Sequence, residues 1–381
     1  MKRQSVMPVS VLEAASPASD QTLLMRQLAA VKDPRKVRGR RFSMVSLLMV
    51  APCATAAGFG SYRAMAQWAA AAGPAERARL GLRAHGVFGL VRTPSADTVR
   101  RALTTVRPGE LEILQRARDT VVEAVAVDGK VLRGSRGGSA GAVTLIGTMA
   151  QDGTFVAQVK VADKSNEIPA LAPLLSVLDL KGVVVTADAL HTQVKTAKVL
   201  VEELGAHFVL TVKRNQPKLW EACRSIPWRE VAARCKVSET GHGRLETRVV
   251  QAVTWTDLEF PYVRQVARIT RHRTQRGTGR RTRETVYVIT DLPVGEASPE
   301  DIGRYARGHW GVENKIHYVR DVTFGEDASR IRTGHGPQNT STLRSAAMNY
   351  LRAMGGSIAD AQRKVALNPH TQGRFKVLVI T

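Results

Sequence analysis

The spacing of hydrophobic positions changes near residue 120. Before it, residues 43–57 and 61–72 are rich in Ala, Leu and Met, and the Gly58-Phe-Gly60 break separates them, which is typical of two helices. Two more helices are expected after Ser95 and after Pro108, where Glu110 and Glu112 would lie in the first turn and suit the helix dipole. These patterns predict an all-α region over residues 1–120.

From residue 121, short apolar runs alternate with helical patterns. The predicted strands lie at residues 125–127, 143–149, 155–161, 182–188 and 207–213. The predicted helices lie at residues 168–180 and 194–204, and Gly205 is a natural C-cap for the second. Asp152-Gly153 predicts a hairpin turn. Strands that alternate with helices are typical of an α/β sheet.

The segment after residue 215 has an irregular, strand-like pattern. Its predicted strands lie at residues 247–254, 263–269 and 285–290. Ser298 begins a helix, because Ser298 can cap, Pro299 suits the first helical position and Asp301 can complete a capping box. This helix should continue to about residue 318, and another is expected over residues 339–354.

The net charge of the chain indicates the kind of partner that it binds. The chain has 381 residues and a formal net charge of +23, with 44% hydrophobic residues. That hydrophobic content indicates a folded protein, and the positive charge indicates a polyanion such as nucleic acid. Residues 32–41 are rich in Lys and Arg, and either contact phosphates or form a solvated linker. Residues 264–283 hold eight arginines and no acid, and we expect them to form a nucleic-acid-binding hairpin that turns at residues 277–279.

Other classes of protein are disfavoured. The three cysteines, Cys53, Cys223 and Cys235, form no CxxC pair, which excludes a disulfide scaffold and a zinc ribbon and fits a reducing cytosol. The most apolar stretch, residues 44–58, is too short for a membrane span and contains Pro52. The N-terminus has no secretory pattern.

Three acids stand where a strand or a helix could deliver them to one point. Asp128 and Asp188 each end a predicted strand, and Glu313 lies in the capped helix. Sites in α/β sheets form at the carboxyl ends of strands, and converging carboxylates repel one another unless cations bind between them. Two such ions about 3.5–4 Å apart would clamp a phosphoryl displacement. Taken singly, Asp128 could belong to a turn, Asp188 could cap a helix and Glu313 could be a surface residue.

Other polar residues lie close to these acids in sequence. Glu167, Asp321, Glu326 and Asp327 are rival acids, but the last two follow the expected helix end and rank below Glu313. His309, Glu313 and His317 share one helical face, where hydrogen bonds to DNA or Glu313, or a structural role, are preferred to a transition-metal site. Phosphate and base contacts, or surface salt bridges, are expected from Lys130, Arg133, His191, Gln193, Lys213, Asn215 and Gln216.

Several motifs in order resemble a DDE transposase of bacterial insertion sequences, in the branch that includes the H-repeat-associated proteins. The region around residues 33–41 resembles the helical part that accompanies this domain, and the likeness covers roughly residues 20–355. The motifs are Ala126-Val-Asp-Gly-Lys-Val-Leu-Arg-Gly-Ser135, Lys164-Ser-Asn-Glu-Ile168, Val185-Thr-Ala-Asp-Ala-Leu-His-Thr-Gln193, Val212-Lys-Arg-Asn-Gln-Pro217, His242-Gly-Arg-Leu-Glu-Thr-Arg248, His309-Trp-Gly-Val-Glu-Asn-Lys-Ile-His317 and Asp321-Val-Thr-Phe-Gly-Glu-Asp-Ala-Ser-Arg330.

The resemblance implies an α/β fold, with a ribonuclease-H-like catalytic core, a β-rich insertion and an all-α N-terminal domain. It implies that Asp128, Asp188 and Glu313 hold two Mg2+ ions, for which Mn2+ can substitute, with Asp128 bridging both. His309 and Arg320 join the expected DNA contacts. The chain departs from the wider Tyr-x2-Arg-x3-Glu-x6-Lys signature, because Ala306, His309 and Arg320 stand at the Tyr, Arg and Lys positions, with Tyr305 and Arg307 nearby.

The expected activity is phosphodiester hydrolysis at the ends of a mobile element, followed by strand transfer into target DNA. The expected partners are double-stranded DNA and a second copy of the chain on paired ends, without a membrane, in the bacterial cytoplasm at the nucleoid. The alternatives are a metal-dependent nuclease without strand transfer and a non-catalytic DNA-binding remnant. The expected domains are residues 1–120 for DNA ends, 121–214 for the first part of the core, 215–295 for the insertion, 296–356 for the rest of the core, and 357–381 for a helix or tail.

Overall fold

A computed structural model describes residues 25–367, apart from residues 27, 39, 86–89, 115–121, 138–140, 164, 233–234 and 242. The chain divides into two compact units, one formed by residues up to Ile113 and from Gly334 on, and the other by Leu114–Thr333. The tail expected at residues 374–381 lies outside the described residues. Whether the predicted domain functions follow this division stays a prediction.

The first unit is mainly helical. Ser43, Ser61 and Ser95 each cap a predicted helix, and each side chain accepts a hydrogen bond from the backbone N–H three residues on. The segment after Pro108 is a 3-10 helix, and a short helix and a hairpin of two strands were not predicted. The elements are α2 (Met44–Ala56), α3 (Tyr62–Ala71), α4 (Pro74–Arg79), β1 (Ala84–His85), β2 (Leu90–Val91), α5 (Ala96–Thr105), the 3-10 helix Pro108–Leu114, α10 (Gly336–Ala353) and α11 (Ile358–Leu367).

The second unit is built on one nine-stranded mixed sheet, in the order β5-β4-β3-β6-β7-β11-β10-β9-β8. Neighbouring strands β3, β6 and β7 are parallel, and the other neighbours are antiparallel. The β-rich segment extends this sheet, because β11 pairs with β7. The strands are β3 (Ala124–Leu132), β4 (Val143–Ala150), β5 (Phe155–Lys160), β6 (Val184–Ala187), β7 (His207–Val212), β8 (Cys235–Gly241), β9 (Arg244–Thr254), β10 (Gln265–Gln275) and β11 (Arg281–Thr290).

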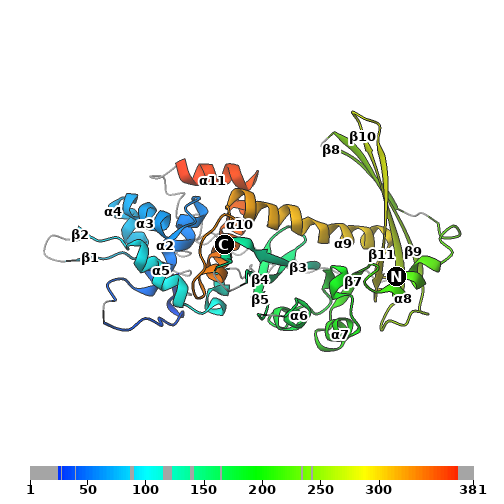
Figure 1. The fold of residues 1–381 in the computed structure, drawn as a ribbon, viewed down its shortest axis with the longest axis horizontal. Coiled ribbons are helices and arrows are strands. Elements are labelled where there is room, and N and C mark those ends of the chain that lie inside the picture. The colour runs from blue at the N-terminus through cyan, green and yellow to red at the C-terminus, as the bar shows by residue number, and fades with distance from the viewer. Residues whose placement is uncertain are drawn as a thin grey trace, which may run out of the picture. The chain divides into compact units, whose positions relative to one another are not determined.

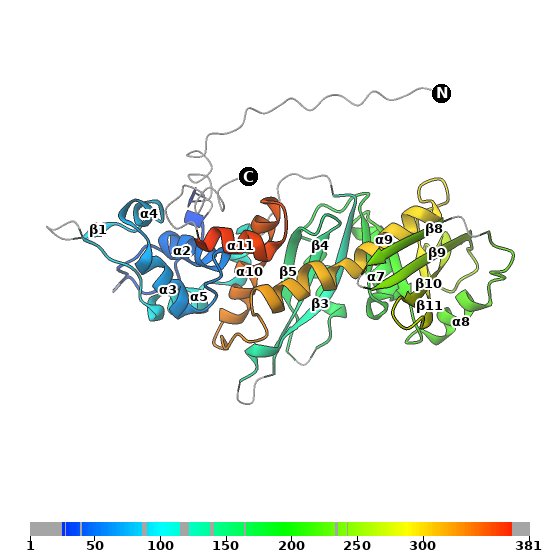
Figure 2. The ribbon, with the colours of Figure 1, turned by 90° about the horizontal axis from the view of Figure 1, so that it is seen from above.

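Helices cover both faces of this sheet. In Figure 2, α9 (Pro299–Val312) runs across one face, and Figure 1 shows α6 (Ile168–Leu175) and α7 (Val194–Lys198) on the other. The capping box of Ser298 and Asp301 is present, but the helix continues beyond residue 318 as π-helical turns over Glu313–His317 and Val319–Thr323. The predicted helix after residue 168 is shorter than expected, and α8 (Pro217–Ser225) was not predicted. No described helix could cross a membrane.

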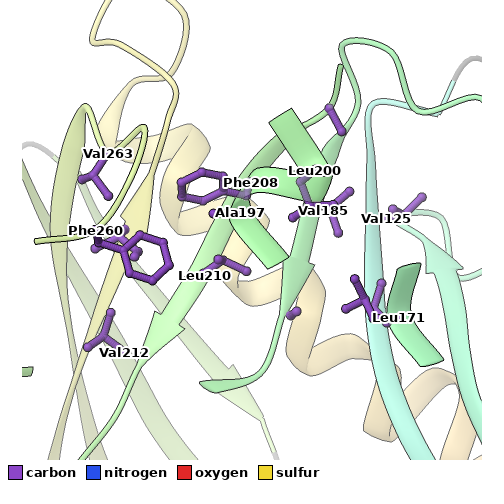
Figure 3. Packing of buried hydrophobic residues seen from close by; sticks show 14 of the residues in the cluster. Val125, Leu171, Val185, Ala197, Leu200, Phe208, Leu210, Val212, Phe260 and Val263 are labelled. Carbon is purple, nitrogen blue, oxygen red and sulfur yellow. The ribbon is translucent and has the colours of Figure 1, made fainter. Parts of the chain in front are cut away.

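The alternation of side chains along β3 decides where its aspartate points. Val125 and Val127 belong to the core cluster shown in Figure 3, which lies between the sheet and α6 and α7. Ala124 belongs to the second cluster, against α9. Since strand side chains alternate between faces, Asp128 shares the α9 face with Ala124. One expectation was wrong, because β3 does not end at Asp128 but continues through it, opposite Gly147 of β4.

Candidate metal centre and basic surfaces

Asp128 and Asp188 come from neighbouring parallel strands. The register pairs Ala126 with Thr186 and Val127 with Ala187, so the two aspartates follow matched positions on β3 and β6. The same alternation directs Asp188, which comes directly after β6, to the α9 face. The fold thus brings two acids that are distant in the sequence to one place on the sheet.

The continuation of α9 adds an acid and a histidine. Donor atoms of Asp128, Glu313 and His317 all lie within 4.8 Å of one another. The Nδ1 atom of His317 lies 3.1 Å from Glu313 Oε2, a hydrogen bond, and 3.8 Å from Asp128 Oδ2. Two of the three predicted acids therefore meet, together with a histidine for which the sequence left several roles open.

Asp188 lies outside this three-residue group. Its Oδ1 atom accepts a hydrogen bond of 2.8 Å from Lys213 Nζ. Burial would by itself raise the pKa of Asp188, but the hydrogen bonds from Lys213 and from the backbone of Ala189 lower it overall. Asp188 is therefore an ionised carboxylate that already has a cationic partner.

Asp128 differs from Asp188, because its pKa is raised rather than lowered. Burial raises its pKa to about 6, and the negative charges of Glu167, Asp188 and Glu313 add to that effect, while a hydrogen bond from the Gly129 backbone opposes it. A partly buried carboxylate on which three other acids act is stabilised by any cation that binds among them. The centre therefore favours a cation for a reason independent of its sequence motif.

This raised pKa predicts a pH-dependent stability. The folded protein holds the Asp128 proton more tightly than the unfolded chain, so ionised Asp128 destabilises the metal-free fold above about pH 6, and this penalty fades as the pH falls. We expect metal-free Asp128→Asn to melt at a higher temperature than the wild type at pH 8, with a smaller difference at pH 5. Melting curves at the two pH values, with chelator present, measure this. Equal differences at both would contradict the raised pKa.

The donor set fits a divalent cation. Carboxylate oxygens are the ligands that Mg2+ and Mn2+ prefer, and an imidazole nitrogen is accepted by Mn2+ and by later transition metals. Asp128, Glu313 and His317 supply two carboxylates and one imidazole at 4.8 Å or less. These residues could hold one ion, and Asp188 directly follows β6, the strand beside β3.

Polar residues after β7 brace the loop that follows Asp188. Asn215 Nδ2 donates to the carbonyl of Ala189, and Gln216 Nε2 donates to the carbonyl of Thr192. Gln216 also donates to Gln193 Oε1, at 3.3 Å. The structure thus places Gln193, Asn215 and Gln216 in a network that holds this loop. Their contacts with DNA stay a prediction.

Lys130 lies on β3, two residues after Asp128, and Arg133 comes directly after the end of this strand. Lys130 Nζ lies 2.6 Å from Asp321 Oδ2, and its side chain is 9% exposed. Arg133 is 81% exposed, with Asp327 at 3.8 Å. Arg133 is thus open to a phosphate, whereas Lys130 already has a carboxylate partner.

Three expected DNA contacts, His191, His309 and Arg320, are buried in the structure, and His191 is 1% exposed. Burial lowers the pKa of His309 to about 4, so this histidine is neutral at pH 7, and its side chain is 8% exposed. Arg320 is 2% exposed and donates through Nε and Nη2 to the two carboxylate oxygens of buried Glu326. As DNA contacts all three expectations need correction, because each of these residues is less than 10% exposed. The rival acid Glu326 is the internal partner of Arg320.

Tyr305 and Arg307 lie near the signature positions at which this chain has other residues, and both have partners within the protein. The hydroxyl of Tyr305 donates to Glu123 Oε1, and Arg307 forms an ion pair with Glu239. Both contacts join α9 to the sheet. The structure therefore gives Tyr305 and Arg307 supporting roles in this unit.

The predicted basic hairpin forms, but part of its charge is neutralised from within. Strands β10 and β11 pair along their length, and Arg273 and Arg271 lie 3.1 and 3.3 Å from the carboxylate of Glu246 on β9. Glu246 is buried. The carboxylate of Glu246 therefore neutralises part of the positive charge of the hairpin. The exposed arginines near the tip are Arg276, Arg280, Arg281 and Arg283, and Arg264 is exposed at the opposite end of the hairpin.

The basic segment at residues 32–41 lines a cavity in the first unit. The cavity has a volume of about 770 Å³, and Arg92, Ser95, Thr98 and Arg101 also line it. Asp33 pairs with Arg35 and Arg40, which shapes the segment. Its cationic lining residues are Arg35, Lys36, Arg38, Arg40, Arg41, Arg92 and Arg101.

Comparisons with known proteins give one consistent result. A family model described as a transposase DDE domain matches residues 122–350, and one described as associated with that domain matches residues 25–116. "Putative transposase YncI" of Escherichia coli O157:H7 is 31% identical over 298 residues, which cover 72% of this chain and 76% of the relative. "H repeat-associated putative transposase YhhI" of Escherichia coli K12 is 28% identical over 302 residues, covering 72% and 78%.

Proposed function

Since the chain belongs to the DDE transposase family, we propose that it hydrolyses phosphodiester bonds at the ends of a mobile DNA element and joins the freed ends to target DNA. The observation that carries the proposal is the meeting of Asp128, Glu313 and His317 within 4.8 Å, from a strand and a helix far apart in the sequence. Asp188 joins them from the neighbouring strand.

In this proposal the chain positions the reacting groups and compensates charge. Asp128, Asp188 and Glu313 would hold divalent ions, with Mg2+ first and Mn2+ as a substitute. When bound, the ions activate the attacking oxygen and neutralise charge on the phosphate. Lys213 holds Asp188 in place, and His317 orients Glu313 through their hydrogen bond. Little covalent chemistry is left to the protein, because phosphoryl transfer depends on positioning and electrostatics.

The fold supports a ribonuclease-H-like core within the second unit. Strands β3, β4 and β5 form an antiparallel meander, and β6 and β7 follow β3 in parallel. We place the catalytic core in these five strands and α9, and the insertion in β8–β11. Assembly as a homodimer on paired ends, and a location at the nucleoid, follow from the same proposal.

The test uses DNA from the termini of the element that encodes the chain. Incubation with Mg2+ should produce cuts at the element ends, and precut ends should become joined to a second DNA. Mapping the cut strands and the joined products measures both steps. Cutting without joining would favour the alternative of a nuclease. Binding that survives chelator, without cutting under any divalent ion, would favour a DNA-binding remnant.

The cavity in the first unit predicts a DNA-binding defect. Arg38 and Arg41 are exposed and line it, so replacing both by Ala should remove phosphate contacts without disturbing the core. We expect the affinity for element ends to fall on the order of tenfold, and the slope of log affinity against log salt to fall by about 0.9 for each lost contact. Fluorescence anisotropy over a salt series measures both. The control is Arg63→Ala, on the exposed part of α3. An unchanged slope would contradict the assignment.

A further inference from the structure

A fourth carboxylate, that of Glu167, lies against the backbone beside Asp128. A Cβ atom added to Gly129 would come within 1.9 Å of Glu167 Oε1 and 2.3 Å of Oε2, so the carboxyl group occupies space that only glycine leaves open. Glu167 directly precedes α6, but its side chain makes no capping hydrogen bond there. It is instead placed against β3, at the residue after Asp128.

A buried histidine faces this carboxylate. His191 is 1% exposed, and its Nε2 atom lies 3.6 Å from Glu167 Oε2. Neither ring nitrogen has a hydrogen-bond partner in the described part of the chain. A buried polar group without a partner costs free energy, so its retention at this point indicates a site that is completed by another group.

Glu167 also lacks a strong cationic partner. Among the residues that the structure describes, no lysine or arginine lies within 4 Å of its carboxylate, and the imidazole of His191 is the group nearest to that role. Asp128 Oδ1 accepts a hydrogen bond of 2.8 Å from the N–H of Gly129, the residue against which the Glu167 carboxylate lies, so both carboxylates are placed at one residue of β3. Two carboxylates placed at one residue without a cation repel each other, and an ion held by both would remove that repulsion.

We propose that Glu167 is a further carboxylate ligand of the divalent-ion centre, sharing an ion with Asp128, and that His191 is a positioning residue that orients the Glu167 carboxylate. The inference rests on the proposed function, because it assigns a ligand to the same centre. It explains why Gly129 follows Asp128, since a side chain there would displace the glutamate.

The experiment counts bound Mn2+ on the full chain by electron paramagnetic resonance of the free ion, without DNA. We expect Glu167→Gln to weaken one Mn2+ site at least tenfold, and Gly129→Ala to do the same, because its methyl group displaces an intact Glu167. The matched control is Glu203→Gln, at an exposed glutamate next to α7 that should leave Mn2+ binding unchanged. Thermal melting checks that each variant folds.

The role of His191 is tested with a conservative pair of variants. His191→Ala should weaken the same Mn2+ site several-fold, and His191→Gln, which keeps a hydrogen-bonding side chain, should recover most of the loss. Normal Mn2+ binding by Glu167→Gln, with loss of binding in Asp128→Asn, would overturn this inference and leave the proposed function intact. A wild-type chain that binds no Mn2+ would contradict both.

Discussion

Asp128→Asn should abolish DNA cutting and strand joining, with a loss of at least about 10³-fold in rate. Asn lacks the negative charge that binds a cation, and Asp128 lies at the meeting point of Glu313, His317 and the strand that carries Asp188. Because an Asn side chain has nearly the same shape and can still accept the hydrogen bond from the Gly129 backbone, the fold should survive. Cleavage of element ends with Mg2+, measured in single turnover, gives the rate.

A matched control separates this effect from a general loss of charge. Asp163→Asn changes an aspartate of the same unit that is 83% exposed and pairs with Lys160. It should cut DNA at the wild-type rate. Asp128→Asn should also bind element ends within a few-fold of the wild type in chelator. Full cutting by Asp128→Asn would contradict the assignment of the centre.

Glu326→Ala should lower the stability of the second unit by about 3–5 kcal/mol, because it leaves a buried guanidinium without its carboxylate. Arg320 and Glu326 are each 2% exposed and are joined by two hydrogen bonds, of 2.7 and 2.9 Å. The pair fastens the end of the long helix to the loop that follows. Thermal melting should show a midpoint lower by roughly 10 °C.

The control for this second prediction is an ion pair of similar length on the surface. Glu221 and Arg224 lie 2.8 Å apart on α8, with more than half of each side chain exposed. Glu221→Ala should leave the melting temperature unchanged, because water solvates both charges when the pair is broken. Equal losses in the two variants would show that burial does not decide the strength of the Arg320–Glu326 pair.

Local patterns predicted much of the fold. The serines at 43, 61, 95 and 298 carry their own capping chemistry, so the helix starts could be found from a few neighbouring residues. The alternation around Val125 and Val127 likewise predicted a buried strand that leads to Asp128. These features depend on residues close in sequence, which is why a single chain sufficed to find them.

Contacts between distant segments could not be found in this way. The pairing of β7 with β11 joins residues about 80 positions apart, and no local pattern separates one continuous sheet from a core with an inserted domain. Glu167 is similar, because its position against Gly129 depends on how α6 packs beside β3. The sequence marked Glu167 as a rival acid and as part of the motif Lys164-Ser-Asn-Glu-Ile168, but neither signal indicated where its carboxylate lies.

The burial of Arg320 follows from the helix geometry beyond Glu313. Each π-helical turn closes on a hydrogen bond five residues back, so it holds one residue more than an α-helical turn would. Every side chain downstream is therefore rotated relative to the register that counting along an α-helix predicts. Deleting one residue between positions 313 and 323 would turn Arg320 away from Glu326. The number of residues in this segment is therefore as important for the buried ion pair as the identity of its side chains.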